Sequence, residues 1–271
     1  HNQGMEVIPQ ILTSDPEDFL DTAVKLKEYG YTEVNLNLGC PSGTVAAKGK
    51  GAGFLKDTEK LARFLGEVSE GMERENLHFS IKTRVGVESE EEFQTLLGLY
   101  NQCPLTELII HPRVLKDFYK YNVRMNAFKE GFEKSRHSVC YNGDIFRRKD
   151  YDRLVKEYPD LDKIMMGRGI MMNPFLMEEI ADGTSQKVSG KMSAARKADR
   201  LEKFHRLLCD GYTHVMSGDR PVLFKMKELW GFLIHSCPEE EKLMKKIRKA
   251  QHLAEYEGVV SELFCRMREH E

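Results

Sequence analysis

The sequence predicts an α/β fold, a (β/α)8 TIM barrel followed by an all-helical bundle. Three observations carry this prediction. Short apolar runs alternate with amphipathic segments up to about residue 183, which indicates parallel strands covered by helices. Polar residues gather at the carboxyl ends of five successive runs, which favours the ring of a barrel mouth over a doubly wound sheet. The sequence after these runs is helical throughout.

Six apolar runs predict strands of the kind that a sheet buries on both faces. They are residues 6–12, 33–38, 78–85, 107–111, 138–143 and 163–167. Helices are expected over residues 14–29, 57–73, 89–101 and 147–157, and in segments that end near 134 and begin near 173. The first helix shows the start signal, with Ser14 and Asp15 before Pro16, and Gly30 ends it. Because a barrel needs eight strands, we expect two more strands to precede His1.

The predicted domains are a barrel over residues 1–183, a linker over 184–190 and a helical domain over 191–271. In the helical domain, the expected helices are 192–216, 222–236, 239–257 and 259–269, with the last break at Gly258. From Lys191 onward, 16 basic residues stand against 13 acidic ones, whereas the first 190 residues hold 25 against 30. A basic region can bind a polyanion, but the charge alone favours an ordinary solvated helical surface.

Composition predicts a reduced, cytoplasmic protein. Charged residues make up 31% of the chain, no signal peptide opens it, and no apolar run nears the length of a membrane span. The cysteines form no CxxC pair and no cluster with zinc spacing, so neither disulfides nor a bound metal are expected. They are Cys40, Cys103, Cys140, Cys209, Cys237 and Cys265.

Two glycine-containing turns follow the last two predicted strands. Asn142, Gly143 and Asp144 form one turn, and Gly167 and Arg168 lie in the other. In a barrel, the loops at these positions commonly bind phosphate through backbone N–H groups. Either turn alone would be an ordinary strand ending, but together they predict a phosphorylated cofactor or substrate.

Three further side chains on the predicted strands could carry chemistry. Lys82, in SIKTRV, could form a Schiff base, donate a proton, face a developing anion or simply reach solvent. His111 ends ELIIH and could be catalytic or a satisfied structural histidine. Gln10 is an amide in an apolar run, so its partners would be either the backbone or a heterocyclic ligand.

Cys40 lies between glycine and proline in LNLGCPSGTVAAKGKGAGF, residues 36–54. A glycine-rich loop can close over a site, and a thiol in it could act as a nucleophile or a general acid. Buried cysteines are also common and mostly inert. The residues alone leave both roles open.

Taken together, the motifs resemble those of the tRNA-dihydrouridine synthases, and of bacterial members most. The resemblance spans about residues 7–180 and rests on VNLNLGCPS…KGKGAGFL, SIKTRVG, LIIHPR, YNGDI and MMGRGIMMNPFLMEEI. It implies an FMN enzyme on a (β/α)8 barrel, with NADPH as reductant and an RNA-binding helical domain. The implied partner is tRNA, with ribosomal RNA left open, and neither a membrane nor a metal is implied.

The resemblance also implies roles for individual residues. The flavin would pass hydride to C6 of an extruded uridine, and Cys40 would give the proton to C5. The implied cofactor contacts are Gln10, Lys82, His111, Asn142, Gly143, Asp144, Gly167 and Arg168. The implied uridine or RNA contacts are Asn37, Arg84 and Arg113, and the helix-spaced cations Lys245, Lys246 and Arg248.

The sequence departs from the family at Pro112 and Val114, where glycine and a small polar residue are common. The Pro-Met-x-Gly motif of the family's first strand has no counterpart, and we expect it upstream of His1. Three rival readings remain: a non-catalytic RNA-binding module, a Schiff-base aldolase that uses Lys82, and a dihydroorotate-type flavin dehydrogenase. No second acid or base accompanies Lys82, which argues against the aldolase, and the basic helical region argues against a free pyrimidine substrate.

Overall fold

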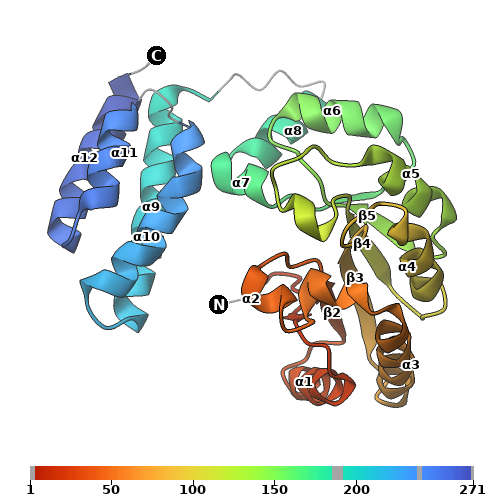
Figure 1. Ribbon diagram of the computed structural model, residues 1–271. Coiled ribbons are helices and arrows are strands. Elements are labelled where there is room, and N and C mark those ends of the chain that lie inside the picture. The colour runs from red at the N-terminus through yellow and green to blue at the C-terminus, as the bar shows by residue number, and fades with distance from the viewer. Residues whose placement is uncertain (1–3, 185–191, 237–239, 270–271) are drawn as a thin grey trace. The chain divides into compact units, whose positions relative to one another are not determined.

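The computed structural model describes residues 4–184, 192–236 and 240–269, and the chain divides into two compact units (Figure 1). Unit 1 comprises His1–Gly143 and Glu157–Met165, and unit 2 comprises Asp144–Lys156 and Met166–Glu271. The expected linker, residues 184–190, lies outside the described residues except for its first one. The expected domain boundaries therefore stay predictions, and each unit is described by itself.

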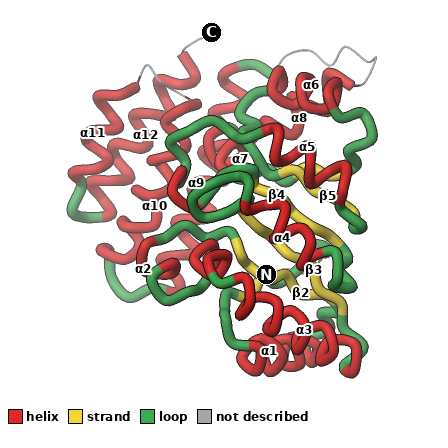
Figure 2. The backbone as a smooth tube through the Cα atoms, turned by 45° about the vertical axis from the view of Figure 1, so that its right-hand side comes forward, coloured by secondary structure: helices red, strands yellow, loops and turns green. Residues whose placement is uncertain are grey.

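A six-stranded parallel sheet runs through unit 1 (Figure 2). Its strands are β1 (Gln10–Ile11), β2 (Glu33–Leu38), β3 (His78–Arg84), β4 (Glu107–His111), β5 (Ser138–Tyr141) and β6 (Lys163–Ile164). The strands lie in chain order and every neighbouring pair is parallel. This is the strand order of a (β/α)8 barrel, and it confirms the predicted fold class.

The first strand is shorter than predicted. An extended run was expected over residues 6–12, whereas ladder pairing is confined to Gln10–Ile11. Pro9 contributes a carbonyl, which accepts the Asn35 N–H (2.8 Å), but it has no N–H to donate. Met5 and Ile8 are 60% and 51% exposed, so apolar packing does not hold the preceding residues in a strand.

Helices alternate with the strands as predicted. They are α1 (Pro16–Glu28), α2 (Gly43–Ala46), α3 (Thr58–Arg74), α4 (Glu92–Tyr100), α5 (Met125–Lys134) and α6 (Arg148–Glu157), with the 3-10 turns η1 (Gly51–Lys56) and η2 (Leu115–Asp117). The Asp15 carboxylate caps α1 by accepting the Asp18 N–H. Phe19 of α1 packs edge-to-face on Phe64 of α3 and Phe79 of β3, with centroid distances of 6.0 and 6.4 Å. Such aromatic contacts fasten the helices to the sheet.

After Met166, the described residues of unit 2 form helices and the turns that join them, as the sequence predicts. The helices in this part are α7 (Arg168–Met172), α8 (Leu176–Thr184), α9 (Ala194–Val215), α10 (Asp219–Leu233), α11 (Glu241–Lys249) and α12 (Leu253–Glu269), with the 3-10 turn η3 (Ile234–Ser236). Trp230, Tyr256 and Phe264 are fully buried at its core. No helix among the described residues is long and apolar enough to span a membrane.

The last helix break was wrongly predicted at Gly258. The chain instead breaks between α11 and α12, and Gly258 lies inside α12. Two long-range hydrogen bonds from α10 hold this break: the Asp219 carboxylate accepts the Leu253 N–H (2.9 Å), and the Lys227 ammonium donates to the Ala250 carbonyl (2.5 Å). Glycine is a weak helix former, but these tertiary contacts decide where the helix ends.

Candidate active site

One face of the sheet in unit 1 is polar. Side chains alternate along a strand, so residues paired in register share a face. Gln10 on β1 pairs with Asn35 on β2, which pairs with Ser80 on β3. The Gln10 amide donates to Asn35 Oδ1 (2.8 Å), and the Asn35 amide donates to Ser80 Oγ (3.0 Å). Gln10 also accepts from Asn37 (2.6 Å), so its partners in the protein are side-chain amides.

Asn37 shapes the turn that carries Cys40. Its Oδ1 accepts the backbone N–H groups of Gly39 (3.0 Å) and Cys40 (2.9 Å). The Cys40 carbonyl accepts the Ala52 N–H (3.0 Å), which ties the turn to the start of η1. The thiol itself is free and partly exposed. It therefore lies accessible at the carboxyl end of β2.

Two glycines let the loop after Cys40 pack closely against its own backbone. Gly51 has a φ of +56°, and a Cβ there would lie 2.8 Å from the Cys40 carbonyl oxygen. A Cβ on Gly53 would lie 2.4 Å from the Ala46 carbonyl oxygen. Close backbone approach is thus one reason for the glycines in this loop. The predicted mobility of the loop stays a prediction.

Lys82 follows Ser80 on the polar face and is half-buried. Burial, and secondly the charge of Arg84, lowers its pKa to about 8, while electrostatic attraction to Cys140 and Cys40 opposes the shift. A Cβ on Gly39 would lie 3.7 Å from Lys82 Nζ, so the ammonium lies under the Cys40 turn. Its three donors have no hydrogen-bond acceptor among the described residues.

His111 ends β4 and is buried. Its Nδ1 lies 2.5 Å from the Asn142 carbonyl, which can only accept, so Nδ1 carries the proton. Burial, helped by the charges of Arg84 and Lys82, lowers the pKa of the imidazole to about 3, although the hydrogen bond with Asn142 opposes the shift. Nε2 of the neutral ring is then an acceptor, and it is buried without a partner. An unsatisfied buried acceptor destabilises a protein, and a ligand that places an N–H or O–H here would satisfy Nε2.

The two arginines that were expected to contact the substrate are buried. Arg84 is 1% exposed and Arg113 is 2% exposed. Arg84 donates one hydrogen bond from each guanidinium nitrogen (2.9 Å each) to the carbonyls of Gly39, Val114 and Phe118. Arg113 Nε donates to the Tyr121 carbonyl (2.7 Å). Both side chains brace the segment after β4, and their contact with the substrate stays a prediction.

The turn after β5 begins in unit 1. The Asn142 amide donates to the Met165 carbonyl (2.8 Å). A Cβ on Gly143 would lie 1.9 Å from the Tyr141 hydroxyl, so no larger residue fits there without displacement. Glycine at this position therefore has a steric reason in addition to any role in binding phosphate.

The expected phosphate residues of unit 2 lie together. Arg168 pairs with Asp144 (2.6 Å), and its guanidinium lies over the Phe146 ring at 5.3 Å. A Cβ on Gly169 would lie 1.9 Å from the Ile145 carbonyl oxygen. The turn after β6 is thus packed tightly against residues 144–146, with a cation at its start.

The expected RNA-contacting cations lie on the exposed face of α11. Lys245 pairs with Glu241 (3.1 Å), and Lys246 pairs with Glu262 (3.5 Å). Arg248 is exposed. The opposite face of α11 is buried in the core of unit 2. This arrangement is compatible with an RNA contact and with an ordinary solvated face.

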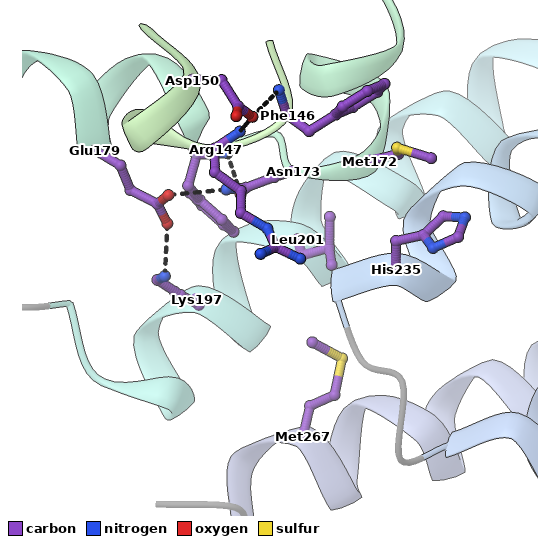
Figure 3. Close-up of a pocket in the computed structure, with 11 residues that line it drawn as sticks. Phe146, Arg147, Asp150, Met172, Asn173, Glu179, Lys197, Leu201, His235 and Met267 are labelled. Carbon is purple, nitrogen blue, oxygen red and sulfur yellow. Dashed lines mark hydrogen bonds and ion pairs between the residues drawn. The ribbon is translucent and has the colours of Figure 1, made fainter. Parts of the chain in front are cut away.

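A pocket of about 630 Å³ opens in unit 2 (Figure 3). On one wall, Glu179 accepts from Asn173 (2.9 Å) and Lys197 (3.0 Å), as Figure 3 shows. Asp150 accepts the Arg147 N–H (3.0 Å). The carboxylates of this pocket are thus already partnered, and none of the expected site residues lines it. We therefore place the candidate site by its unpartnered groups, Lys82 and His111, and not by cavity volume.

Comparison with known proteins shows the family. The sequence profile of the dihydrouridine synthases (Dus) matches residues 1–265. This chain belongs to the dihydrouridine synthase family. The Staphylococcus aureus (strain Mu50) protein named "Probable tRNA-dihydrouridine synthase" is 31% identical over 179 residues, 64% of this chain and 53% of the relative. A protein of the same name from Staphylococcus epidermidis (strain RP62A) is 30% identical over 210 residues, 73% of this chain and 63% of the relative.

The chain therefore spans about half the length of the first of these dihydrouridine synthase relatives. Among solved structures, morphinone reductase is similar, with 16% identity and a TM-score of 0.45 over 65% of this chain and 50% of that structure. Among the described residues, no group of three or more histidine, cysteine or acidic side chains could hold a metal ion.

Sequence reasoning missed two residues of this family member that support the candidate site. Asn35 links Gln10 to Ser80 across two strands. Its alternation with Asn37 on β2 was a signal that could have revealed it. Tyr119 lies with its ring 5.9 Å from His111 and 5.3 Å from the Arg84 guanidinium. No sequence signal marked Tyr119, because its contacts depend on how the segment after β4 folds back.

Proposed function

We propose that this protein is an enzyme that reduces the C5–C6 double bond of uridine in tRNA, with FMN as cofactor and NADPH as reductant. The observation that carries the proposal is the pair of unpartnered groups at the carboxyl end of the sheet, the Lys82 ammonium and His111 Nε2. Membership of the dihydrouridine synthase family supports it. The choice of tRNA rests on the names of the relatives.

The residues present fit a flavin. The Lys82 cation suits the ring edge that becomes negative on reduction, and His111 Nε2 can accept from an N–H or O–H of the ligand. The exposed Gln10 amide can exchange its side-chain partners for a heterocycle. We assign the phosphate to the turns after β5 and β6, that is, to Asn142, Gly143, Asp144, Gly167 and Arg168.

When bound, the flavin supplies the hydride that C6 of the uridine receives. C5 then gains carbanion character and needs a proton. We assign this proton to the Cys40 thiol: the S–H bond breaks, a C5–H bond forms, and a thiolate remains. Lys82 stabilises the thiolate electrostatically until solvent returns the proton. Asn37 positions the thiol through the turn that its side chain closes.

A visible absorption spectrum of the purified protein, after incubation with FMN and gel filtration, tests the cofactor. Retained flavin bands support the proposal. Incubation with NADPH and tRNA from cells that lack dihydrouridine, followed by nucleoside mass spectrometry, tests the reaction. A colourless protein that cannot be reconstituted, yet still binds tRNA, would instead support a non-catalytic RNA-binding module.

We also assign contacts to the RNA backbone to Lys245, Lys246 and Arg248 of α11. Each phosphate contact adds to the salt dependence of binding. Replacing all three by alanine is expected to weaken tRNA binding and to flatten its dependence on salt, while flavin content stays unchanged. A salt titration of tRNA affinity would measure both effects, and an unchanged slope would count against the assignment.

A further inference from the structure

The segment between β4 and α5 exposes three aromatic side chains within four residues. Phe118, Tyr119 and Tyr121 are 45%, 51% and 63% exposed, with Lys120 among them. We call Phe118–Tyr121 the aromatic tip. Most phenylalanines of unit 1, such as Phe79 at 1%, are buried. Exposed apolar rings gathered in this way indicate a surface that a partner covers.

Polar contacts hold the tip in one shape. Arg84 donates to the Phe118 carbonyl, and Arg113 donates to the Tyr121 carbonyl. At the start of the segment, the Asp117 carboxylate accepts the Val114 N–H (3.1 Å) and two hydrogen bonds from Arg124 (3.0 Å each). A surface fixed before binding loses little conformational entropy when a partner binds.

The backbone of the tip is strained at Phe118. This residue has φ +48° and ψ −101°, in a region that side chains other than glycine rarely adopt. Core packing does not require this strain, because the Phe118 ring is nearly half exposed. Strained residues held by their surroundings concentrate at functional sites. The hydrogen bond that the Phe118 carbonyl accepts from Arg84 is one contact that holds this conformation.

The aromatic tip adjoins the candidate active site. The Tyr119 ring lies 5.9 Å from the His111 ring and 5.3 Å from the Arg84 guanidinium. Tyr119 thus connects the tip to the carboxyl end of the sheet. A single large ligand could therefore occupy the candidate active site and also cover Phe118 and Tyr121.

We propose that Phe118 and Tyr121 stack on unpaired nucleobases that flank the target uridine, and that Lys120 contacts the adjoining phosphate. This inference rests on the proposed function. Proteins bind single-stranded nucleic acids with aromatic rings and nearby cations. The rings stack on the bases, since every base has a π face, and the cations contact the phosphates. The substrate is then an RNA loop whose neighbouring nucleotides are unpaired, and a uridine in a continuous duplex is excluded.

The test uses an RNA hairpin with a single uridine in its loop, and the FMN-loaded protein. Phe118→Ala and Tyr121→Ala are each expected to raise KM for the hairpin about tenfold, because one stacked base contributes of that order. The value of kcat and the RNA-independent oxidation of NADPH should not change. Tyr121→Phe should bind like the wild type, because the ring does the stacking. Tyr29→Ala is the matched control: Tyr29 is 81% exposed and ends α1, just before the amino end of β2.

A second hairpin, with abasic sites beside the uridine, identifies the contact. The wild type should bind this abasic hairpin about as weakly as the alanine variants bind the intact hairpin. For the alanine variants, removing the bases should weaken binding little further. Equal binding of both hairpins by wild type and variants would overturn the proposal. A dimer that dissociates on Phe118→Ala in size-exclusion chromatography would also overturn it and make the tip an interface between two copies of the chain.

These outcomes separate the stacking proposal from the proposed function. Affinity for a labelled hairpin, measured by fluorescence anisotropy, reports on the tip without any turnover. If the wild type forms no dihydrouridine but Tyr121→Ala still weakens hairpin binding, the reaction is wrong and the stacking surface stands. If the wild type turns over and the tip variants match it in KM and affinity, only the stacking proposal fails.

Discussion

Each unit of the molecule buries a histidine, and the two differ in whether Nε2 has a partner. His205 in unit 2 is 5% exposed, and its Nε2 lies 2.5 Å from the Tyr256 hydroxyl, whose oxygen accepts from Trp230 (2.8 Å). His111 in unit 1 is 6% exposed, and its Nε2 has no partner. Burial lowers the pKa of both rings, to about 4 and about 3. Burial and pKa therefore do not distinguish these two histidines, whereas the unmet hydrogen bond of His111 does.

The largest expected effect comes from replacing Cys40, to which we assign the transfer of a proton. Cys40→Ala should lower dihydrouridine formation about 10²- to 10⁴-fold, the usual contribution of a general acid. FMN content and oxidation of NADPH should persist. Cys265→Ala, which removes an exposed thiol in unit 2, is the control. Wild-type turnover by Cys40→Ala would show that another group supplies the proton.

Replacing Lys82 tests whether its unmet donors belong to the cofactor. Lys82→Met should weaken FMN binding about 10- to 100-fold, because a hydrogen bond to a charged group is lost. In the wild type, affinity for FMN should fall as pH rises through about 8, where Lys82 loses its charge. A fluorescence titration of FMN against pH measures both effects. The exposed Lys25→Met is the control, and identical titrations for Lys82→Met and the wild type would refute the contact.

His205 is expected to make the stability of unit 2 depend on pH. Its pKa falls from 6.5 to about 4 on folding, chiefly because of burial, although the charges of Glu202 and Asp210 oppose the shift. A depressed histidine pKa contributes stability that is complete above pH 6.5 and is lost as pH falls towards 4. The loss is about 3 kcal/mol over this range. Chemical denaturation at several pH values measures it.

A matched variant isolates the histidine from the other groups of the pocket beside it, which include Cys209 and Glu257. His205→Gln keeps a hydrogen-bonding side chain but does not titrate, so its stability should depend less on pH between 6.5 and 4. The exposed His214→Gln should behave like the wild type. If His205→Gln retains the full pH dependence, other groups cause it.

The smallest expected effects come from replacing two glycines. At one of them an added Cβ would meet open space, and at the other it would clash with the backbone. A Cβ on Gly258 in α12 would meet no atom within 4 Å, so Gly258→Ala should raise the free energy of unfolding by about 1 kcal/mol. Gly53 in unit 1 is the opposite case, because its Cβ would lie 2.4 Å from the Ala46 carbonyl oxygen. Gly53→Ala should lower the melting temperature. Thermal unfolding of the two variants compares them, and equal shifts would contradict the packing argument.

Sequence alone predicted the order of strands and helices, because that order follows from local apolar periodicity. It also placed Lys82 and His111 at strand ends, since alternation along a strand is a local property. It could not predict the burial of Arg84. The sequence around a strand-end arginine does not show whether its guanidinium will contact a substrate or donate to three backbone carbonyls. The break between α11 and α12 was missed for the same reason, since Asp219 acts on it across 34 residues.

The central claim is that a ligand completes Lys82 and His111 in unit 1, whereas the buried polar side chains in the described part of unit 2 already have partners. The most direct measurement is ¹⁵N NMR of the histidine side chains during a titration with FMN. The account predicts that the Nε2 resonance of His111 shifts on binding and that of His205 does not. An unchanged His111 resonance in a protein that has taken up FMN would contradict it.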